Sequence, residues 1–203
     1  MLVILGTAHG SNVNGKRSPD ERLVEYKWSR EMCYLIQAGL NEKGISCIID
    51  IEGEIEESLT KRKLIVNDIC KKYNKNKCIY ISIHVNAALQ NTWSKASGWT
   101  VYVGDNCSEN SKKLALSLFN TIDKYNKENN KNLFGNRKYP KTKYYEAPLY
   151  ILKQTSCPAV LTENMYMTNK DEVDFLLSEE GKCLLCDLHV EGICNYINSM
   201  KKK

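Results

Sequence analysis

The order of apolar patterns along the chain is the feature that most constrains its fold. Short apolar runs, typical of buried strands, alternate with longer segments in which apolar residues recur every three or four positions, as in helices. This alternation predicts an α/β fold: a mostly parallel, twisted sheet with helices on both faces. We find no internal repeat or linker, so we expect residues 1–203 to form a single domain. The expected strands are 2–5, 45–51, 78–85, 98–103, 149–152 and 159–162, and the expected helices are 19–43, 59–74, 109–126, 170–178 and 180–199.

The predicted helix 19–43 has a recognisable start and one unusual buried position. Ser18-Pro19-Asp20-Glu21 matches a capping box with proline at the first helical position. The apolar stripe through Met32 and Ile36, continued backwards at 100° per residue, places Glu25 in the middle of the buried face. A carboxylate in that position must be paired, hydrogen-bonded or bound to a metal.

Two of the three histidines follow predicted strands. His9 comes after the first strand, His84 ends the strand 78–85, and Glu163 follows the strand 159–162 in the same way. Open α/β folds place their ligands at these carboxyl ends. Each residue taken alone is equally well explained as a hydrogen-bonded structural side chain. The third histidine, His189, lies off the apolar stripe of its helix, and we expect it at the surface.

Together these residues have the composition of a catalytic zinc site. Such sites use three protein ligands, often two histidines and a glutamate, and leave one position for water. A further carboxylate that is not a ligand can act as the general base. We therefore assign His9, Glu25 and His84 as metal ligands and Glu163 as the base. The ligand types also suit other divalent ions, and the HExxH zinc motif is absent.

The nine cysteines are expected to be free thiols. They are scattered along the chain, their number is odd, and we recognise no secretory signal. Cys183 and Cys186 form a CxxC, which could indicate a redox or zinc site. Because this pair lies in a predicted helix and no second CxxC exists, we expect buried or half-buried thiols there.

Charge and hydropathy narrow the possible partners. The net charge of +5 favours anionic surroundings. We find no helix-turn-helix or aromatic RNA-binding signature, and so we expect no nucleic acid. No apolar run has the length of a signal peptide or a membrane span, which predicts a protein made in the cytoplasm without membrane insertion. The lysine tail at 200–203 is expected to be a flexible, solvated helix end.

Four segments, in order across almost the whole chain, resemble the zinc-dependent N-acetylmuramoyl-L-alanine amidases of the amidase_3 family. This family includes bacterial cell-wall amidases and phage endolysins. The segments are ILGTAHGSNVNGKRSPD, EYKWSRE, ISIHVNAA and CPAVLTENMYMTN.

The resemblance implies the same site as the chemistry: one zinc ion on His9, Glu25 and His84, with Glu163 as the catalytic glutamate. The chain departs from the family pattern at two positions that are not ligands. Gly6-Thr7-Ala8 stands where Asp-Pro usually precedes Gly-His, and Ser29 replaces a helix asparagine. These departures can alter how the ligands are held. The family's arginine in the second helix corresponds to Arg62, which we expect to be structural.

The resemblance also implies the reaction, hydrolysis of the amide between the lactyl group of N-acetylmuramic acid and L-alanine in peptidoglycan. We expect a monomer that binds this substrate through Asn86 and through Arg137 and Tyr145 of the polar loop 127–148. The expected biological form is a phage or prophage endolysin, released to the wall with a holin. The alternatives are a zinc endopeptidase acting on stem peptides and a catalytically silent wall-binding module.

Overall fold

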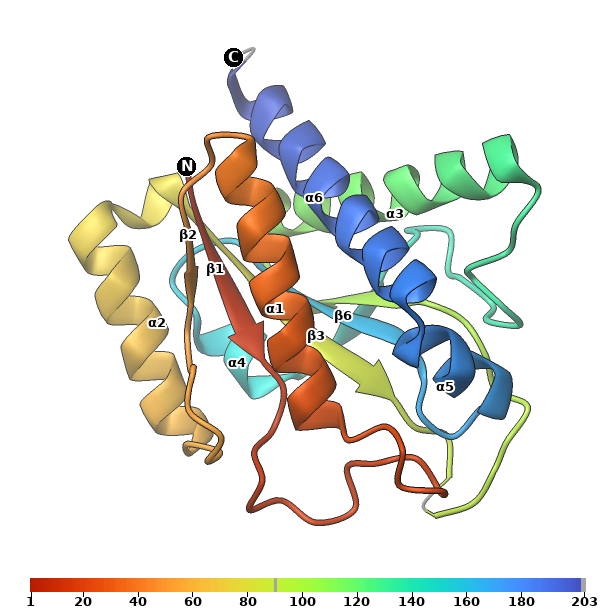
Figure 1. The fold of residues 1–203 in the computed structure, drawn as a ribbon. Helices are drawn as coiled ribbons and strands as arrows, with labels where there is room; N and C mark the ends of the chain where they lie inside the picture. The colour runs from red at the N-terminus through yellow and green to blue at the C-terminus, as the bar shows by residue number, and fades with distance from the viewer. Residues whose placement is uncertain (90, 202–203) are drawn as a thin grey trace.

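A computed structural model describes residues 1–89 and 91–201 and has a six-stranded sheet at its centre (Figure 1). The strand order is β2-β1-β3-β6-β4-β5, and only the pair of β4 and β6 is antiparallel. The predicted α/β fold with a mostly parallel sheet is therefore confirmed. The strands are β1 (Leu2–Thr7), β2 (Cys47–Ile49), β3 (Cys78–Asn86), β4 (Thr100–Gly104), β5 (Tyr145–Ala147) and β6 (Ala159–Tyr166).

Helices cover both faces of the sheet, as predicted. Successive side chains of a strand point to opposite faces, and β1 shows this directly. Val3 and Leu5 belong to one apolar core, and Leu2 and Ile4 belong to a second. The first core is covered by α1 (Glu25–Glu42), α3 (Glu109–Asn129), α5 (Lys170–Leu177) and α6 (Glu179–Lys201), and the second by α2 (Leu59–Tyr73) and α4 (Tyr150–Gln154).

The predicted start of the first helix is wrong. Residues 18–24 form a loop, and α1 begins at Glu25. The Ser18 hydroxyl accepts from the amide of Leu23, five residues later, instead of capping a helix that starts beside it. Glu21 has φ of 60°, a left-handed conformation that a helix excludes. The chain therefore turns here and enters α1 with Glu25 as its first residue.

Two further expectations, for the run 149–152 and for Cys183, differ from the structure. The run 149–152, predicted as a strand, contains the start of α4, whose Ile151 and Leu152 face the second core. A short apolar run does not distinguish a strand from one buried helical turn.

All nine cysteines are unpaired as expected, and Cys186 is half-buried, but Cys183 is exposed. Met200 and Lys201 complete α6, and the remainder of the predicted flexible tail, 202–203, lies outside the described residues.

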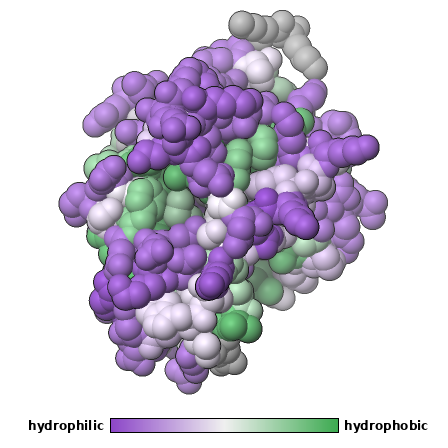
Figure 2. Space-filling model, turned by 90° about the vertical axis from the view of Figure 1, so that its right-hand side faces the viewer, coloured by the Kyte–Doolittle hydropathy of each residue, from purple (hydrophilic) through white to green (hydrophobic). Residues whose placement is uncertain are grey.

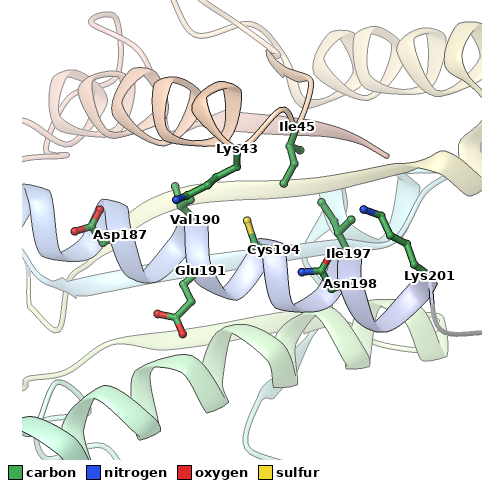
Figure 3. Close-up of a pocket in the computed structure, with 9 residues that line it drawn as sticks. All are labelled: Lys43, Ile45, Asp187, Val190, Glu191, Cys194, Ile197, Asn198 and Lys201. Atoms are coloured by element: carbon green, nitrogen blue, oxygen red, sulfur yellow. The ribbon is translucent and has the colours of Figure 1, made fainter.

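A cavity of about 560 Å³ lies between α6 and the turn that follows α1 (Figure 3). Lys43 and Ile45 line it from the turn, and Cys194 and Ile197 line it from α6. The turn is at the carboxyl end of α1, whereas the predicted ligand Glu25 is at its amino end. The helix spans about 1.5 Å per residue over its 18 residues, so this cavity is remote from the predicted site.

The face on the right of Figure 1 is mostly hydrophilic, with hydrophobic side chains in separate patches (Figure 2). Among the described residues, no helix combines the length and the apolar character needed to cross a bilayer.

Candidate metal centre

The fold brings the three predicted ligands together. β1 and β3 are parallel neighbours, with Thr7 opposite Ile83, so His9 and His84 emerge from the same edge of the sheet. The helix α1 begins near this edge (Figure 1), and Glu25 is its first residue. One nitrogen from each imidazole and one oxygen of the carboxylate all lie within 4.8 Å of one another.

Local structure fixes Glu25 in place. Its backbone amide donates to the carbonyl of Lys16, which joins the start of α1 to the preceding loop. Its Oε1 accepts from the Val85 amide at 3.1 Å and contacts His84 Nδ1 at 3.2 Å. The residue is only 2% exposed, so its charge needs a partner within the site.

Two of the spacings between donor atoms are close to those around a tetrahedral zinc ion. Two donors that each lie about 2.0–2.1 Å from a tetrahedral zinc are about 3.3 Å apart. Glu25 Oε1 is 3.2 Å from His84 Nδ1, and Glu25 Oε2 is 3.6 Å from His9 Nε2. Two imidazole nitrogens and a carboxylate are also a donor set that zinc prefers. These residues could therefore hold the ion without a large rearrangement.

The other nitrogen of each imidazole has its own partner. His9 Nδ1 lies 3.4 Å from Glu56 Oε1, and His84 Nε2 lies 3.0 Å from the Ser82 hydroxyl. Such outer partners select the tautomer and turn the remaining nitrogen toward the metal. Neither partner was among the residues predicted from the sequence. Ser82 was recognisable, because it lies two residues before His84 and therefore on the same face of β3. Glu56 had no comparable signal.

The pKa values of the three groups reflect burial and their charges on one another. Burial lowers the pKa of His9, and the neighbouring His84 lowers it further. Burial opposes ionisation of Glu25, but hydrogen bonding and charge from His84 outweigh it and lower the pKa of Glu25. The same carboxylate raises the pKa of His84 against the effect of its burial. A positive charge among the three groups is thus favourable, and a divalent cation supplies it.

Glu163 lies on the neighbouring strand β6, directly opposite His84 in the register. Its Oε2 is buried and has no hydrogen-bond partner among the described residues. Burial raises the pKa of this carboxyl to about 7, partly offset by the positive charge of His84. Glu163 is therefore a carboxyl group with one unpartnered oxygen and a pKa near neutrality. It is not one of the three grouped donors.

The expected surface position of His189 is wrong. The residue is 1% exposed, and its Nε2 lies 3.1 Å from the hydroxyl of Thr162 on β6. Its Nδ1 contacts the carbonyl of Leu185 at 2.7 Å. Several elements pack around α6, namely α1, α3 and α5. Side chains off the main apolar stripe are consequently buried as well.

Ser29 and Arg62 hold the backbone near the ends of β1 and β3. Ser29 stands where the family usually has an asparagine, and Arg62 was expected to be structural. The hydroxyl of Ser29 accepts from the Ala8 amide and donates to the carbonyl of Ile83, which ties β1 to β3 beside the ligands. Arg62 forms a buried ion pair with Asp50 at 2.8 Å and donates to the Thr7 carbonyl. Both contacts hold the backbone that precedes His9 or His84.

The predicted substrate-binding residues are spread along the same side of the sheet. Arg137 donates to the hydroxyls of Tyr102 and Tyr166, and its guanidinium lies 5.0 Å from the ring centre of Tyr145. Tyr166 lies on β6 with Glu163, three residues further along the strand. Asn86 ends β3, and its Oδ1 accepts from the Ala87 amide.

The fold and the cluster define a class of protein: an α/β domain with a potential two-histidine, one-carboxylate metal site at the carboxyl edge of its sheet. Comparison with known sequences gives the family. The chain belongs to the N-acetylmuramoyl-L-alanine amidase family Amidase_3, whose sequence profile matches residues 3–195.

Two curated relatives are similar in sequence. The endolysin of Bacillus phage SPP1 is 26% identical over 170 residues, which cover 79% of this chain and 56% of that protein. The probable cell wall amidase LytH of Staphylococcus saprophyticus is 27% identical over 193 residues, covering 95% of this chain and 55% of that protein. The chain thus spans about half the length of these relatives.

Solved structures share the fold. An N-acetylmuramoyl-L-alanine amidase from Clostridium difficile 630 superimposes with a TM-score of 0.81 at 22% identity, covering 98% of this chain and 97% of that one. The catalytic domain of CwlV from Bacillus (Paenibacillus) polymyxa gives 0.77 at 18% identity, with coverages of 97% and 98%.

Proposed function

We propose that residues 1–203 form one catalytic domain, a zinc-dependent N-acetylmuramoyl-L-alanine amidase. It hydrolyses the amide between the lactyl group of N-acetylmuramic acid and L-alanine in peptidoglycan. The observation that carries this proposal is the grouping of His9, Glu25 and His84 within 4.8 Å, in a chain of the amidase family. Glu163 on the adjacent strand adds the carboxylate that the reaction requires.

His9, Glu25 and His84 would hold the zinc ion in this proposal. When bound, zinc supplies Lewis-acid chemistry: it polarises a carbonyl oxygen and makes a bound water more acidic. Glu56 and Ser82 hold the two imidazoles in the orientation that directs one nitrogen of each toward Glu25.

Glu163 would move the proton. Its carboxylate would accept a proton from the attacking water and return it to the departing alanine nitrogen. A base of this kind works best with a pKa near the operating pH, and burial raises that of Glu163 to about 7. The raised pKa of Glu163 thus suits both transfers.

Arg137, Tyr145 and Asn86 would contact the substrate. The guanidinium over the Tyr145 ring offers a rigid, positively charged surface. Arg137→Ala and Tyr145→Ala should then raise KM for peptidoglycan fragments. Unchanged turnover and KM in both variants would remove these residues from the site.

The biological role that fits these features is that of a phage or prophage endolysin. We infer a monomer that is made in the cytoplasm and reaches the wall after a holin opens the membrane. Similarity to a protein named endolysin supports this role. Lysis of cells that express the chain should require co-expression of a holin. Lysis without one would contradict this part of the proposal.

The test is a digest of purified peptidoglycan with mass analysis of the soluble products. The proposal predicts intact stem peptides with a free L-alanine amine and glycan without peptide, both abolished by chelation and by Glu163→Gln. Products cut within the stem would indicate a zinc endopeptidase. Zinc binding without any product would indicate a wall-binding module.

A further inference from the structure

A groove of about 360 Å³ lies beside the metal site and plays no part in the chemistry described so far. One wall is the loop 14–17, which leads toward α1, and the other is formed by 87–89 and 91 after β3 and by Met167 and Thr168 after β6. The two segments of this second wall are tied together, since the Ala88 amide donates to the Thr168 hydroxyl.

The groove starts close to the reacting groups. Ala87 follows His84 by three residues, and Met167 follows Glu163 by four, at about 3.3 Å per extended residue. Lys16 is joined to Glu25 through the hydrogen bond from the Glu25 amide to the Lys16 carbonyl. The charge of Lys16 also acts on the carboxyl of Glu163, where it opposes the effect of burial. A ligand extending from the metal site can therefore enter this groove directly.

The charge of the groove is entirely positive. Lys16 and Arg17 are the only charged side chains among the described residues that line it. Lys16 is exposed and forms no ion pair with any residue that the structure describes. Arg17 has only a long contact with Glu21, at 3.6 Å between two well-exposed side chains. Both cations are thus available to an anionic ligand.

A second pocket borders the same histidines but has a different character. It has a volume of about 160 Å³ and lies on the sheet face covered by α2 and α4, where Leu59, Ile151 and Leu161 line it. Its lining is mostly apolar, and its arginine, Arg62, is already paired with Asp50. Unpaired positive charge is therefore found in the groove and not in this second pocket.

We propose that the groove formed by 14–17, 87–89, 91 and 167–168 binds the peptide side of the substrate and selects stem peptides whose residue after L-alanine has a free carboxylate. The proposal rests on the amidase function proposed above. Of the two parts joined by the scissile amide, the peptide is the part that carries carboxylates. Lys16 and Arg17 bind this anion and thereby set which end of the substrate lies on which side of the metal.

The test compares two disaccharide–tetrapeptide fragments that differ only in whether this carboxylate is free or amidated. The wild-type protein should show a KM about fivefold lower for the free acid, the size expected for a partly solvated ion pair. The preference should decrease with added salt, because exposed charges are screened. Lys16→Gln combined with Arg17→Gln should bring the two KM values within about twofold of each other.

Lys71→Gln is the control, since it makes one of the same charge changes at an exposed position of α2, outside the groove and outside the loop 127–148. It should keep the wild-type preference. Equal KM values in the wild type, or an unchanged preference in the double variant, would overturn the proposal.

Binding of both fragments to Glu163→Gln is measured in parallel by calorimetry. If neither fragment is hydrolysed by the wild type, the amidase function fails, while the preference for the free acid is still tested by these affinities.

Discussion

His189 makes the stability of the fold depend on pH in a defined window. The imidazole is buried beneath β6, and burial lowers its pKa from 6.5 to about 4. In the unfolded chain the same group takes up a proton as the pH falls below about 6.5. Between these two values the unfolded state binds more protons than the folded state. The stability due to the neutral His189 is therefore present above pH 6.5 and is lost as the pH falls toward 4.

The size of this effect follows from the two pKa values. A shift of one pKa unit corresponds to about 1.36 kcal/mol. With pKa values of 6.5 and about 4 for the unfolded and folded states, lowering the pH from 7.5 to 5 should reduce the free energy of unfolding by about 2 kcal/mol through His189 alone.

Urea unfolding of the wild type and of His189→Gln at pH 7.5, 6 and 5 isolates this contribution. Glutamine is polar and does not titrate, so other ionisable groups cancel in the difference between the two proteins. The variant should be less stable at pH 7.5, and its deficit should shrink by about 2 kcal/mol at pH 5. A deficit that stays constant within about 0.5 kcal/mol would refute the reasoning.

Two other substitutions probe the supports of the metal site. Asp50→Asn leaves Arg62 buried without its counter-ion. It should lower the free energy of unfolding by about 3 kcal/mol in urea titrations. A loss below about 1 kcal/mol would show that Arg62 does not depend on Asp50 for its burial. Ser82→Ala removes the partner of His84 Nε2, and it should weaken zinc binding by about tenfold in a competition assay with a chromogenic chelator, with little change in stability. Unchanged zinc affinity would show that the Ser82 hydroxyl does not orient the ring.

The proximity of His9, Glu25 and His84 could be predicted from the sequence because regular strand and helix geometry decides where these residues lie. His9 and His84 come directly after or at the end of apolar strands, and parallel strands bring such ends to one edge. The burial of Glu25 followed from helix phase alone. Phase does not depend on where a helix begins, so this prediction held even though the helix starts six residues later than expected.

The errors arose where tertiary contacts decide the structure. His189 is buried because three helices surround α6, which the apolar pattern of one helix does not reveal. Ser18 has the residue types of a capping box, but the left-handed Glu21 turns the chain away from a helix. Glu56 meets His9 across a long separation in the chain, and its segment offers several glutamates without a periodic pattern to choose among them.

The most direct test of the account is the zinc content of the purified protein, measured together with cleavage of peptidoglycan. We expect one zinc per chain in the wild type and in Glu163→Gln, with cleavage only by the wild type. His84→Ala should lose both the metal and cleavage. Loss of zinc in Glu163→Gln, or cleavage by that variant at the wild-type rate, would contradict the assignment of Glu163 as the base beside a metal held by His9, Glu25 and His84.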